Sequence, residues 1–542
     1  MSDSSLSFRR PLYSSEKDLR NAARELKQRG ARLLYAFAND EHKLGVGQFK
    51  IYYMFLSREG RRFEFLEYAL GKEEKYPSLY DEFPTVDAGE WEIADYFGLL
   101  PQNRAVTPGM YLHAEYGDIY PLRREFADQS LRDRLDSVSL ESSRGQLGKE
   151  KFESDSDTIC ISGEHKSINE PEKVYVRSQA GRDGHYISKV EFQFGHQARL
   201  IEYIGQQEFY LNDVAELAEQ IYLPSACSFA AATSRAVEKL PGMRVRLTLA
   251  AEIVRELLVR LEVIENLIHY VDDLARSVFF FKGNQSHVSE LYQQMLQLNQ
   301  AIGGGSFLNN LICVGGVNLP SGLDTQLIRK TLQHVIPEFQ ELAFQLAYDD
   351  GFCSRTIGRG RLTLDQTIAT GANGIMASSR GLDLDFRNCQ PYGIYAHPDG
   401  SRLFADATRE MEHSTFFPRG RDGDVYSRFL ETVTEIRLSA NIIKHLIALW
   451  GNLPRSQRDC WQEVDLMSSD PYHTSVGYDR GYGGENIVWL MSDKLGRICR
   501  IAVCSASFRN LPAVCLSLQG ELFENLPLII TSAPFSRAEI SK

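Results

Sequence analysis

The sequence predicts an α+β protein, with a small N-terminal α/β domain followed by a large, mainly helical bundle domain with terminal β-hairpins. Three observations favour this fold class. β-rich runs with turn signals crowd residues 1–127, long stretches of helical periodicity fill the second half, and strand-like runs return near the C-terminus. A length of 542 residues exceeds what one core usually holds, so two or three domains are expected.

The N-terminal domain, residues 1–127, is expected to be an antiparallel sheet with helices against one face. A helix is predicted over residues 15–29, because Gly30 after it is suited to a left-handed cap. The runs FKIYYMFL and RFEFLEYAL flank the turn residues 58–61 and indicate a β-hairpin.

Residues 128–173 differ in composition from both flanks. They are charged, rich in serine and almost free of aromatic side chains. Such a segment buries too little apolar surface to offset the entropy of ordering it. We therefore predict a polar linker between the two domains.

The C-terminal domain, residues 174–542, is predicted to be a bundle of long helices. Apolar residues recur at helical spacing from 247 to 278, and further helices are expected over 286–303, 323–350 and 424–450. Pro337 should kink the third of these helices. Near the end of the chain, NIVWLMSD and RICRIAVC flank a short turn and predict a β-hairpin.

Charge and cysteine usage exclude several classes of function. The net charge of −12 argues against a nucleic-acid partner, which needs clustered lysine and arginine. We find no signal peptide and no apolar run of the roughly 18–20 residues that a spanning helix needs, so membrane attachment is expected only through partner subunits. The nine cysteines contain no C-x-x-C pair, a pattern that fits neither zinc nor iron–sulfur ligation.

A basic loop at Arg355, Arg359 and Arg361 leaves two interpretations open. It is either a solvated turn or a surface that faces an acidic cofactor or partner. The triple glycine at 303–305 lacks the lysine of a phosphate-binding loop and is interpreted as a helix stop.

Two ordered motifs in the N-terminal domain carry a family resemblance. AGEWEIADYFGL is followed about twenty residues later by YPLRREF, and together they resemble the 30-kilodalton subunit of respiratory complex I. The matching positions are Glu90, Trp91, Glu92, Asp95, Phe97, Gly98, Pro121, Leu122, Arg123, Arg124 and Phe126.

From residue 174 onward the chain is similar to the 49-kilodalton complex I subunit and to the large subunit of membrane-bound nickel–iron hydrogenases. The matching blocks are AAATSRAVEKL, SFLNNLICVGGVNLP, SRTIGRGRLTLDQTIATGANGIMASSRGLDLDFRNCQPYGIYA, GDVYSRFLETVTEIRLSANIIK and GYGGENIVWLMSDKLGRICRIAVCSASFRNL. Fusion of the two parts resembles the large subunit of formate hydrogenlyase.

The cysteines that hold the metal pair in those hydrogenases are missing. The resemblance places one C-x-x-C pair in QIYLPSACSFAAA, where Cys227 is a lone remnant and Pro224 stands at its partner's position. It places the second pair in IITSAPFSRAEISK, which has no cysteine. Because soft thiolates are what such a metal pair requires, we predict no metal site and no hydrogen chemistry.

The complex I branch uses the vacated cavity to bind a quinone headgroup with a tyrosine and a histidine. The resemblance makes Tyr222 and His185 the candidate acceptor-site residues. Other interpretations stay open, namely a tyrosine that closes a helix N-terminus and a histidine on a surface loop. The histidine-arginine-glycine element of the family is replaced by LIEYIGQQEFYLND.

The resemblance implies a peripheral electron-transfer subunit on the cytoplasmic face of the cell membrane, within a complex I-like, ion-pumping assembly. This chain itself should bind no cofactor. An iron–sulfur small subunit would carry the terminal cluster, antiporter-like membrane subunits would support the chain, and quinone is the candidate substrate. The alternative is a redox-inactive coupling subunit, and a formate-linked hydrogenase is disfavoured by the missing cysteines. Any oxidation of NADH should take place on another subunit.

Overall fold

The computed structural model forms two compact units, Met1–Tyr203 with Ile368–Gly371 and Ile540–Lys542, and Ile204–Thr367 with Ala372–Glu539. They are called unit 1 and unit 2 below. The structure describes residues 11–44, 48–57, 62–106, 109–112, 119–124, 158–161, 173–181, 184–194, 198–243, 245–278, 286–319, 322–382, 384–412 and 419–542.

Unit 1 contains the antiparallel sheet that the N-terminal sequence predicts. Its strand order is β1-β4-β3-β2, in which β2, β3 and β4 pair antiparallel and β1 lies parallel to β4. The bounds are β1 (Leu12–Tyr13), β2 (Arg32–Asp40), β3 (Phe49–Leu56) and β4 (Phe63–Ala69). The predicted hairpin is therefore confirmed as β3–β4, although its turn at 58–61 lies outside the described residues.

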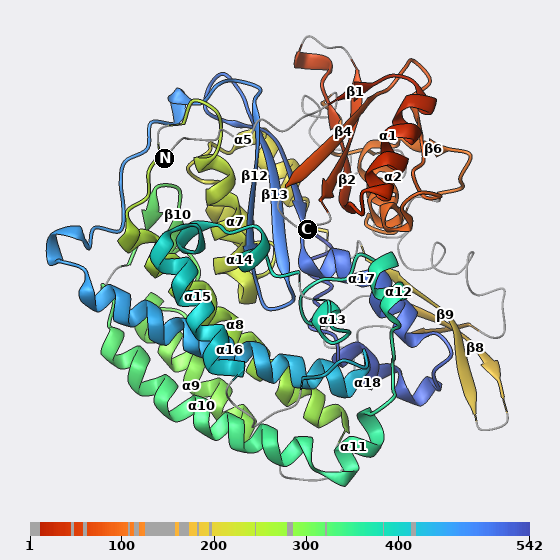
Figure 1. Cartoon of the computed structure of the whole chain (residues 1–542). Coiled ribbons are helices and arrows are strands. Elements are labelled where there is room, and N and C mark those ends of the chain that lie inside the picture. Colours follow the sequence, from red (N-terminus) through yellow and green to blue (C-terminus); the bar gives the residue numbers. More distant parts are fainter. Residues whose placement is uncertain are drawn as a thin grey trace, which may run out of the picture. The chain divides into compact units, whose positions relative to one another are not determined.

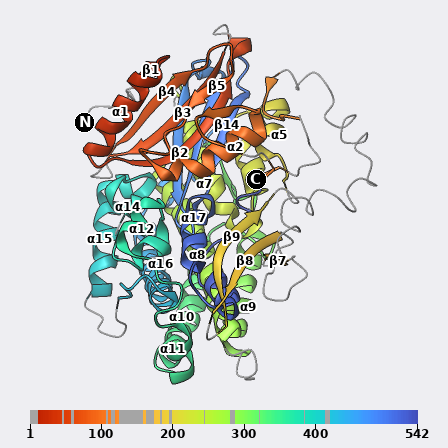
Figure 2. The same cartoon turned by 90° about the vertical axis from the view of Figure 1, so that its right-hand side faces the viewer.

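Two helices pack on this sheet (Figures 1 and 2). α1 (Glu16–Gln28) contacts β1 and β4, and α2 (Asp87–Phe97) contacts β2. α1 ends before Gly30, whose φ of 74° is the left-handed conformation that the sequence predicts. Its buried face comprises Leu19, Ala23 and Leu26, at the spacing of successive helical turns.

Two smaller strand groups complete unit 1. β5 (Lys75–Pro77) pairs in parallel with β6 (Leu100–Gln102), and an antiparallel sheet has the order β7-β8-β9, with bounds Thr158–Ile161, Lys173–Ala180 and His185–Gln193. Apart from β7 and Lys173, the predicted linker at 128–173 lies outside the described residues. The domain boundaries at 127 and 173 stay predictions.

Unit 2 is built around the long helices that the periodicity predicts. They are α8 (Leu249–Val278), α9 (Ser286–Gly303), α10 (Thr325–Ala347) and α16 (Val425–Asn452). α8 packs against α9 and α16, and α10 packs against the same two helices, which gives a bundle (Figure 1). Asp324 and Asp424 cap α10 and α16 by accepting backbone N–H groups of their first turns.

A three-stranded antiparallel sheet lies beside the bundle. Its strands are β12 (Thr474–Arg480), β13 (Glu485–Ser492) and β14 (Ile498–Cys504), and every residue in them is buried. The predicted terminal hairpin is β13–β14, and the sequence did not indicate β12. α7 (Ala226–Glu238) packs on β12 and β13, so closely that a Cβ at Gly477 would collide with the carbonyl oxygen of Ala232.

Shorter elements link these parts. The strands are β10 (Ile312–Cys313) and β11 (Gly316–Val317), and the helices are α5 (Ile201–Glu208), α6 (Val214–Glu219), α11 (Asp350–Thr356), α12 (Leu364–Ala369), α13 (Gly374–Ser378), α14 (Phe386–Cys389), α15 (Pro398–Glu412), α17 (Ala506–Leu518) and α18 (Leu526–Thr531). Within the described ranges, each helix is too short or too polar to cross a bilayer. The fold class is α+β, as the sequence predicts.

Candidate functional site

Tyr222 lies at the entrance to α7. It is half-buried and precedes a single 3₁₀ turn, Leu223–Ser225, in which Ser225 N–H donates to the Tyr222 carbonyl at 2.8 Å. The turn is held from the bundle by Asn266 on α8, whose amide donates to the Pro224 carbonyl at 2.6 Å. Tyr222 therefore stands directly before a helical segment as a half-buried residue, and its role as an acceptor-site residue stays a prediction.

Cys227 lies in the first turn of α7 and is buried. Its thiol donates to the Leu308 carbonyl at 3.0 Å. Burial, together with the nearby Glu262 carboxyl, raises the pKa of this thiol well above its ordinary value. Because a metal ligand must be a thiolate, these surroundings do not suit Cys227 for holding a soft metal ion.

Glu262 of α8 binds the amino end of α7. Its two carboxyl oxygens accept the N–H groups of Cys227, at 2.6 Å, and Ser228, at 3.1 Å. These bonds favour the charged form, but burial outweighs them and raises the pKa of Glu262 well above 4.5. The carboxyl satisfies two donors that would otherwise be orphaned at a helix end.

The C-terminal segment meets the same turn of α7. Glu539 is buried and accepts hydroxyl groups from Ser225, at 3.0 Å, and Ser507, at 2.6 Å. Seven residues before it, the Ser532 hydroxyl accepts from Arg428 at 3.0 Å, and the Ser532 carbonyl accepts the Tyr270 hydroxyl.

The structure thus brings together the two segments to which the resemblance assigns thiolate pairs. The groups that meet are hydroxyls and carboxyls, which are hard oxygen donors and do not fit a nickel–iron pair. In the described ranges, no group of three or more His, Cys, Asp or Glu side chains is placed to hold a metal ion.

His185, the second candidate acceptor residue, belongs to unit 1, whereas Tyr222 belongs to unit 2. It is the first residue of β9, directly after Gly184, and its side chain is exposed. Its register partner is Ala180 at the end of β8, so it lies at the turn end of the β8–β9 hairpin. This location agrees with a histidine on a surface turn.

Comparisons with known proteins match both parts of the chain. A family model of the 30 Kd subunit of respiratory-chain NADH dehydrogenase matches residues 12–130, and a model of the 49 Kd subunit matches residues 287–474. Formate hydrogenlyase subunit 5 of Escherichia coli is 24% identical over 519 residues, which cover 93% of this chain and 84% of that protein.

Two quinone oxidoreductase subunits are similarly related. The D-type subunit of NADH-quinone oxidoreductase from Granulibacter bethesdensis is 25% identical over 394 residues, covering 66% of this chain and 90% of that protein. The C/D-type subunit of the same enzyme from Phocaeicola vulgatus is 22% identical over 432 residues, which cover 75% of this chain and 76% of that protein. The chain is a fused subunit of the complex I and hydrogenase type.

In this fused subunit, residues of the 30-kilodalton-type motif make hydrogen bonds to the backbone of unit 1. Asp95 on α2 accepts the backbone N–H groups of Gly109, Tyr111 and two neighbours, at 2.6 to 3.3 Å. Arg123 donates to the Phe97 carbonyl at 2.6 Å. The motif residues therefore tie α2 to the segment that follows it.

A second feature of the fused subunit is a buried ionic network, which the sequence did not identify. Arg260 on α8 pairs with Glu256 at 2.7 Å and with Glu435 on α16 at 3.4 Å, and all three side chains are buried. Arg235 on α7 pairs with Asp479 on β12. The network continues through further ion pairs among Asp385, Arg387, Arg480 and Glu485. The Tyr392 hydroxyl donates to Asp479, and the Tyr395 hydroxyl donates to Glu256.

Pairing controls the charge of this network. Arg387 and Arg480 lower the pKa of Glu435 below its ordinary value, so that this carboxyl stays ionised although buried. The only sequence signal was that α8 carries Glu or Arg in almost every turn despite its apolar periodicity.

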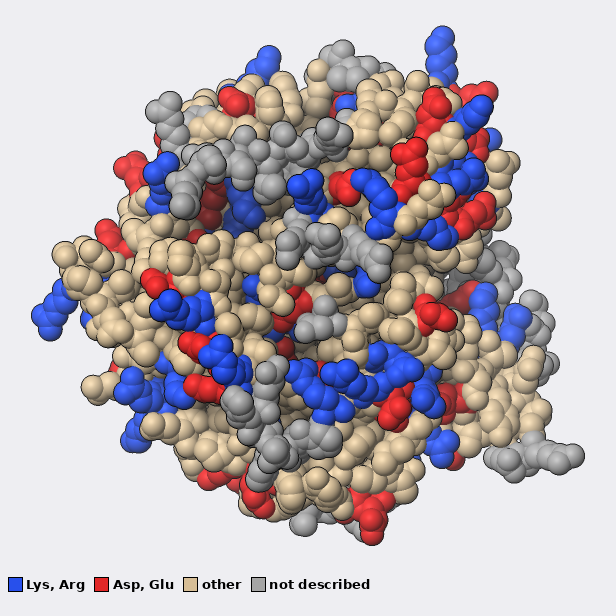
Figure 3. Space-filling model, viewed as in Figure 1, with Lys and Arg blue, Asp and Glu red and all other residues tan. Residues whose placement is uncertain are grey.

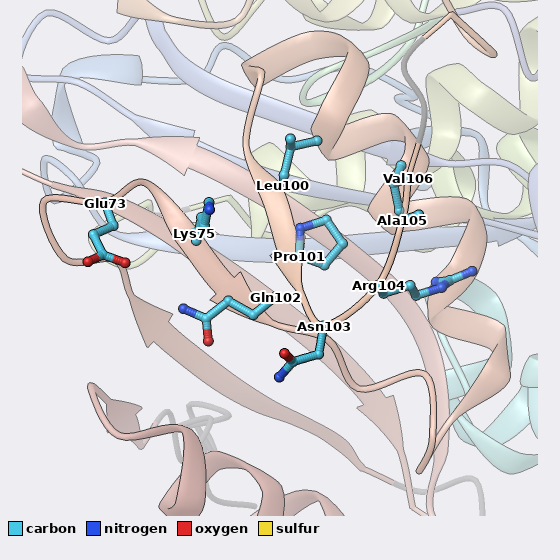
Figure 4. A pocket seen from close by; sticks show the side chains of 9 residues that line it. All are labelled: Glu73, Lys75, Leu100, Pro101, Gln102, Asn103, Arg104, Ala105 and Val106. Atoms are coloured by element: carbon cyan, nitrogen blue, oxygen red, sulfur yellow. The ribbon is translucent and has the colours of Figure 1, made fainter.

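Two cavities are found among the described residues. One, of about 540 Å³, is in unit 2 and has Glu219, Cys313, Asn318 and the exposed Trp461 in its wall. Burial raises the pKa of Glu219 to about 8, so it is neutral at pH 7. The other, of about 410 Å³, is in unit 1 and is lined by β5, β6 and the residues that follow, from Leu100 to Val106 (Figure 4).

Proposed function

We propose that this fused subunit is a peripheral electron-transfer subunit of a membrane-bound, complex I-like assembly that pumps ions. Quinone or another small acceptor would be reduced beside Tyr222, with an iron–sulfur small subunit and antiporter-like membrane subunits as partners. The chain would lie on the cytoplasmic face of the membrane. The names of the related proteins, among them the D-type and C/D-type subunits of NADH-quinone oxidoreductase, support this proposal.

The observation that carries the proposal is the chemistry at the start of α7. The two segments that correspond to the metal-binding ends of a hydrogenase meet at Ser225 and Glu539, and they meet through oxygen rather than sulfur groups. A partly accessible tyrosine stands directly before them. Such a constellation suits hydrogen bonding to a carbonyl acceptor better than metal binding.

Reduction of a quinone to a quinol takes two electrons and two protons. The electrons would come from the partner's iron–sulfur cluster and the two protons from bulk water, one of them by way of the Tyr222 hydroxyl. The Tyr222 hydroxyl would donate to a quinone carbonyl oxygen, and this bond would strengthen as negative charge develops there. His185, which belongs to unit 1, is kept as the second candidate residue that the resemblance implies, and its substitution is tested separately.

A second function, that of a redox-inactive coupling subunit, is favoured by one observation. The hydroxyl of Ser225, the thiol of Cys227 and the carboxyl of Glu262 are all engaged within the chain. Because of these bonds, the three groups already have partners within the chain and are not available to a bound quinone. In that case the subunit would transmit conformational change to membrane subunits without reducing a substrate.

The deciding experiment compares electron transfer to quinone analogues in membranes that carry the intact assembly, for wild type, Tyr222→Phe and His185→Gln. Loss of a single donor to a developing anion should lower turnover by roughly 10²–10³-fold. Tyr210→Phe, at another partly exposed tyrosine, is the matched control and should retain wild-type turnover. Undiminished turnover in Tyr222→Phe removes Tyr222 as a donor. No quinone reduction in a wild-type assembly with all its clusters would favour the coupling function.

A further inference from the structure

The backbone of a loop of unit 2, residues 357–362 between α11 and α12, is fixed by hydrogen bonds to side chains of other elements. The N–H of Gly358 donates to the buried Asp424 carboxylate at 2.7 Å, and the N–H of Gly360 donates to Glu521 at 2.7 Å. Arg428, fully buried, donates to the Gly360 carbonyl at 3.0 Å. These charge-assisted bonds fix the backbone of the loop.

Two glycines allow this backbone path. Gly358 and Gly360 have φ angles of 75° and 59°, in the left-handed region that other residues rarely adopt. At Gly360 a Cβ atom would also lie 2.8 Å from the Arg428 guanidinium. The loop is therefore built into one conformation, and its outward side chains start from fixed positions.

The outward side chains are basic with one apolar residue among them. Arg359 and Arg361 of the loop are exposed, and so is Arg355, which the structure places in the last turn of α11 rather than in the loop. Ile357 is 54% exposed. Among the described residues, the Arg359 guanidinium has no ion-pair or hydrogen-bond partner. Arg361 donates to the Asp422 carbonyl at 3.2 Å, and its ion pair with the exposed Asp422 carboxylate, at 3.5 Å, is a weak surface pair.

Two further arginines adjoin the loop. The Arg380 guanidinium donates to the Arg421 carbonyl, and Arg421 is exposed. Both lie next to the loop, and Gly423 shows this. Its carbonyl accepts the N–H of Leu362, at the end of the loop, and a Cβ built on it would be 3.0 Å from Arg380 Cδ. Figure 3 shows Lys and Arg side chains gathered in a band on this face of the molecule.

We call Arg355, Arg359, Arg361, Arg380 and Arg421, with Ile357 among them, the arginine patch. The patch contrasts with the net charge of −12 of the chain, and it contains arginine and no lysine. Arginine presents a planar fork of donors that pairs with a carboxylate through two parallel hydrogen bonds. Arginine is also one of the residues enriched in binding hot spots between proteins.

We propose that the arginine patch docks a carboxylate-rich face of a partner subunit, with Ile357 inserted between the ion pairs. This inference rests on the proposed function, in that it requires the chain to work within an assembly. A rigid loop with forked donors favours a shaped protein surface over a fluid anionic lipid surface, for which flexible lysines would serve equally well.

The test uses the full chain, tagged and purified from native membranes with its partner subunits. The charge-reversed variant is Arg359→Glu/Arg361→Glu/Arg421→Glu. The matched control is Arg329→Glu/Arg402→Glu/Arg455→Glu, three exposed arginines of the same unit outside the patch. The charge-retaining variant Arg359→Lys/Arg361→Lys/Arg421→Lys shows whether the loop tolerates substitution. In a fourth sample, a photoreactive benzoylphenylalanine at position 357 captures whatever faces Ile357.

We expect wild type and control to retain the same subunits, and the charge-reversed variant to lose one of them at least about tenfold, since like charges across an interface repel. The cross-linked peptide of that subunit should be rich in Asp and Glu. Full retention by the charge-reversed variant, or a cross-link to a peptide without acidic residues, would overturn the inference. So would a variant that keeps every subunit and loses only binding to phosphatidylglycerol vesicles. A wild-type chain that carries no partner refutes the proposed function itself, and the inference with it.

Discussion

Glu262 offers the sharpest test of how the start of α7 is held. The carboxyl has one oxygen for each of two backbone donors, Cys227 N–H and Ser228 N–H. Glu262→Gln keeps the shape but leaves one oxygen, so one of the two N–H groups loses its acceptor. Glu262→Ala removes both acceptors. An unsatisfied buried donor costs about 1–3 kcal/mol, so the two changes should cost about 1–3 and about 2–6 kcal/mol.

Amide hydrogen exchange measures this cost locally, without requiring the whole chain to unfold in one step. In Glu262→Gln one of the two amides should exchange about 5- to 150-fold faster, and in Glu262→Ala both should do so. Glu290→Gln, at a glutamate whose side chain is 65% exposed on α9, is the control and should leave α7 unchanged. Unaltered exchange at both amides in Glu262→Ala would refute the reasoning.

The raised pKa of Glu262 adds a pH dependence to this prediction. The folded-state pKa of Glu262 lies above the ordinary 4.5. The stabilisation that the protonated Glu262 gives to the folded start of α7 is therefore fully present below pH 4.5 and is lost as pH rises through the folded-state pKa. Protection of α7, corrected for the intrinsic exchange rate, should therefore fall with rising pH in wild type. It should be flat in Glu262→Gln. A wild-type profile that rises with pH would contradict the assigned direction.

Three further predictions follow from other parts of the chain. Purified protein should contain no stoichiometric nickel by elemental analysis, and Cys227→Ala should lower the free energy of unfolding by about 1 kcal/mol without changing the metal content. In unit 1, Lys542 pairs with Glu202 at 2.9 Å and Glu92 at 3.1 Å, and Lys542→Met should destabilise that unit by about 3–5 kcal/mol at pH 8. Because burial raises the pKa of Glu92 to about 7, protonation should relieve this loss at pH 5, and thermal melting at the two pH values measures the difference. Limited proteolysis should cut first within 128–173, and first cuts at 60–125 or 245–450 would contradict the predicted linker.

Several features of the fold could be predicted from the sequence because their causes are local. The periodic apolar positions of α8, the aspartate cap of α16, and the turn signals of β3–β4 and β13–β14 act within a few residues of one another. Gly30 was predicted to end α1 for the same reason, and its φ of 74° agrees. The loss of the thiolate pairs could also be seen directly in the sequence, because it depends on residue identity at recognisable motifs.

The environment of each candidate site residue was decided by tertiary structure. In sequence, Glu256 and Arg260 appear as charges that would turn an apolar helix toward solvent. They are buried because Glu435, Asp479 and Tyr395, distant along the chain, supply the pairing that burial of a charge requires. The contact of Ser225 with Glu539 spans 314 residues and likewise has no local signal. The sequence by itself therefore determined the long helices, the hairpins β3–β4 and β13–β14 and the absence of the thiolate pairs. Only the packing of distant segments decided which charges are paired and which arginines remain exposed.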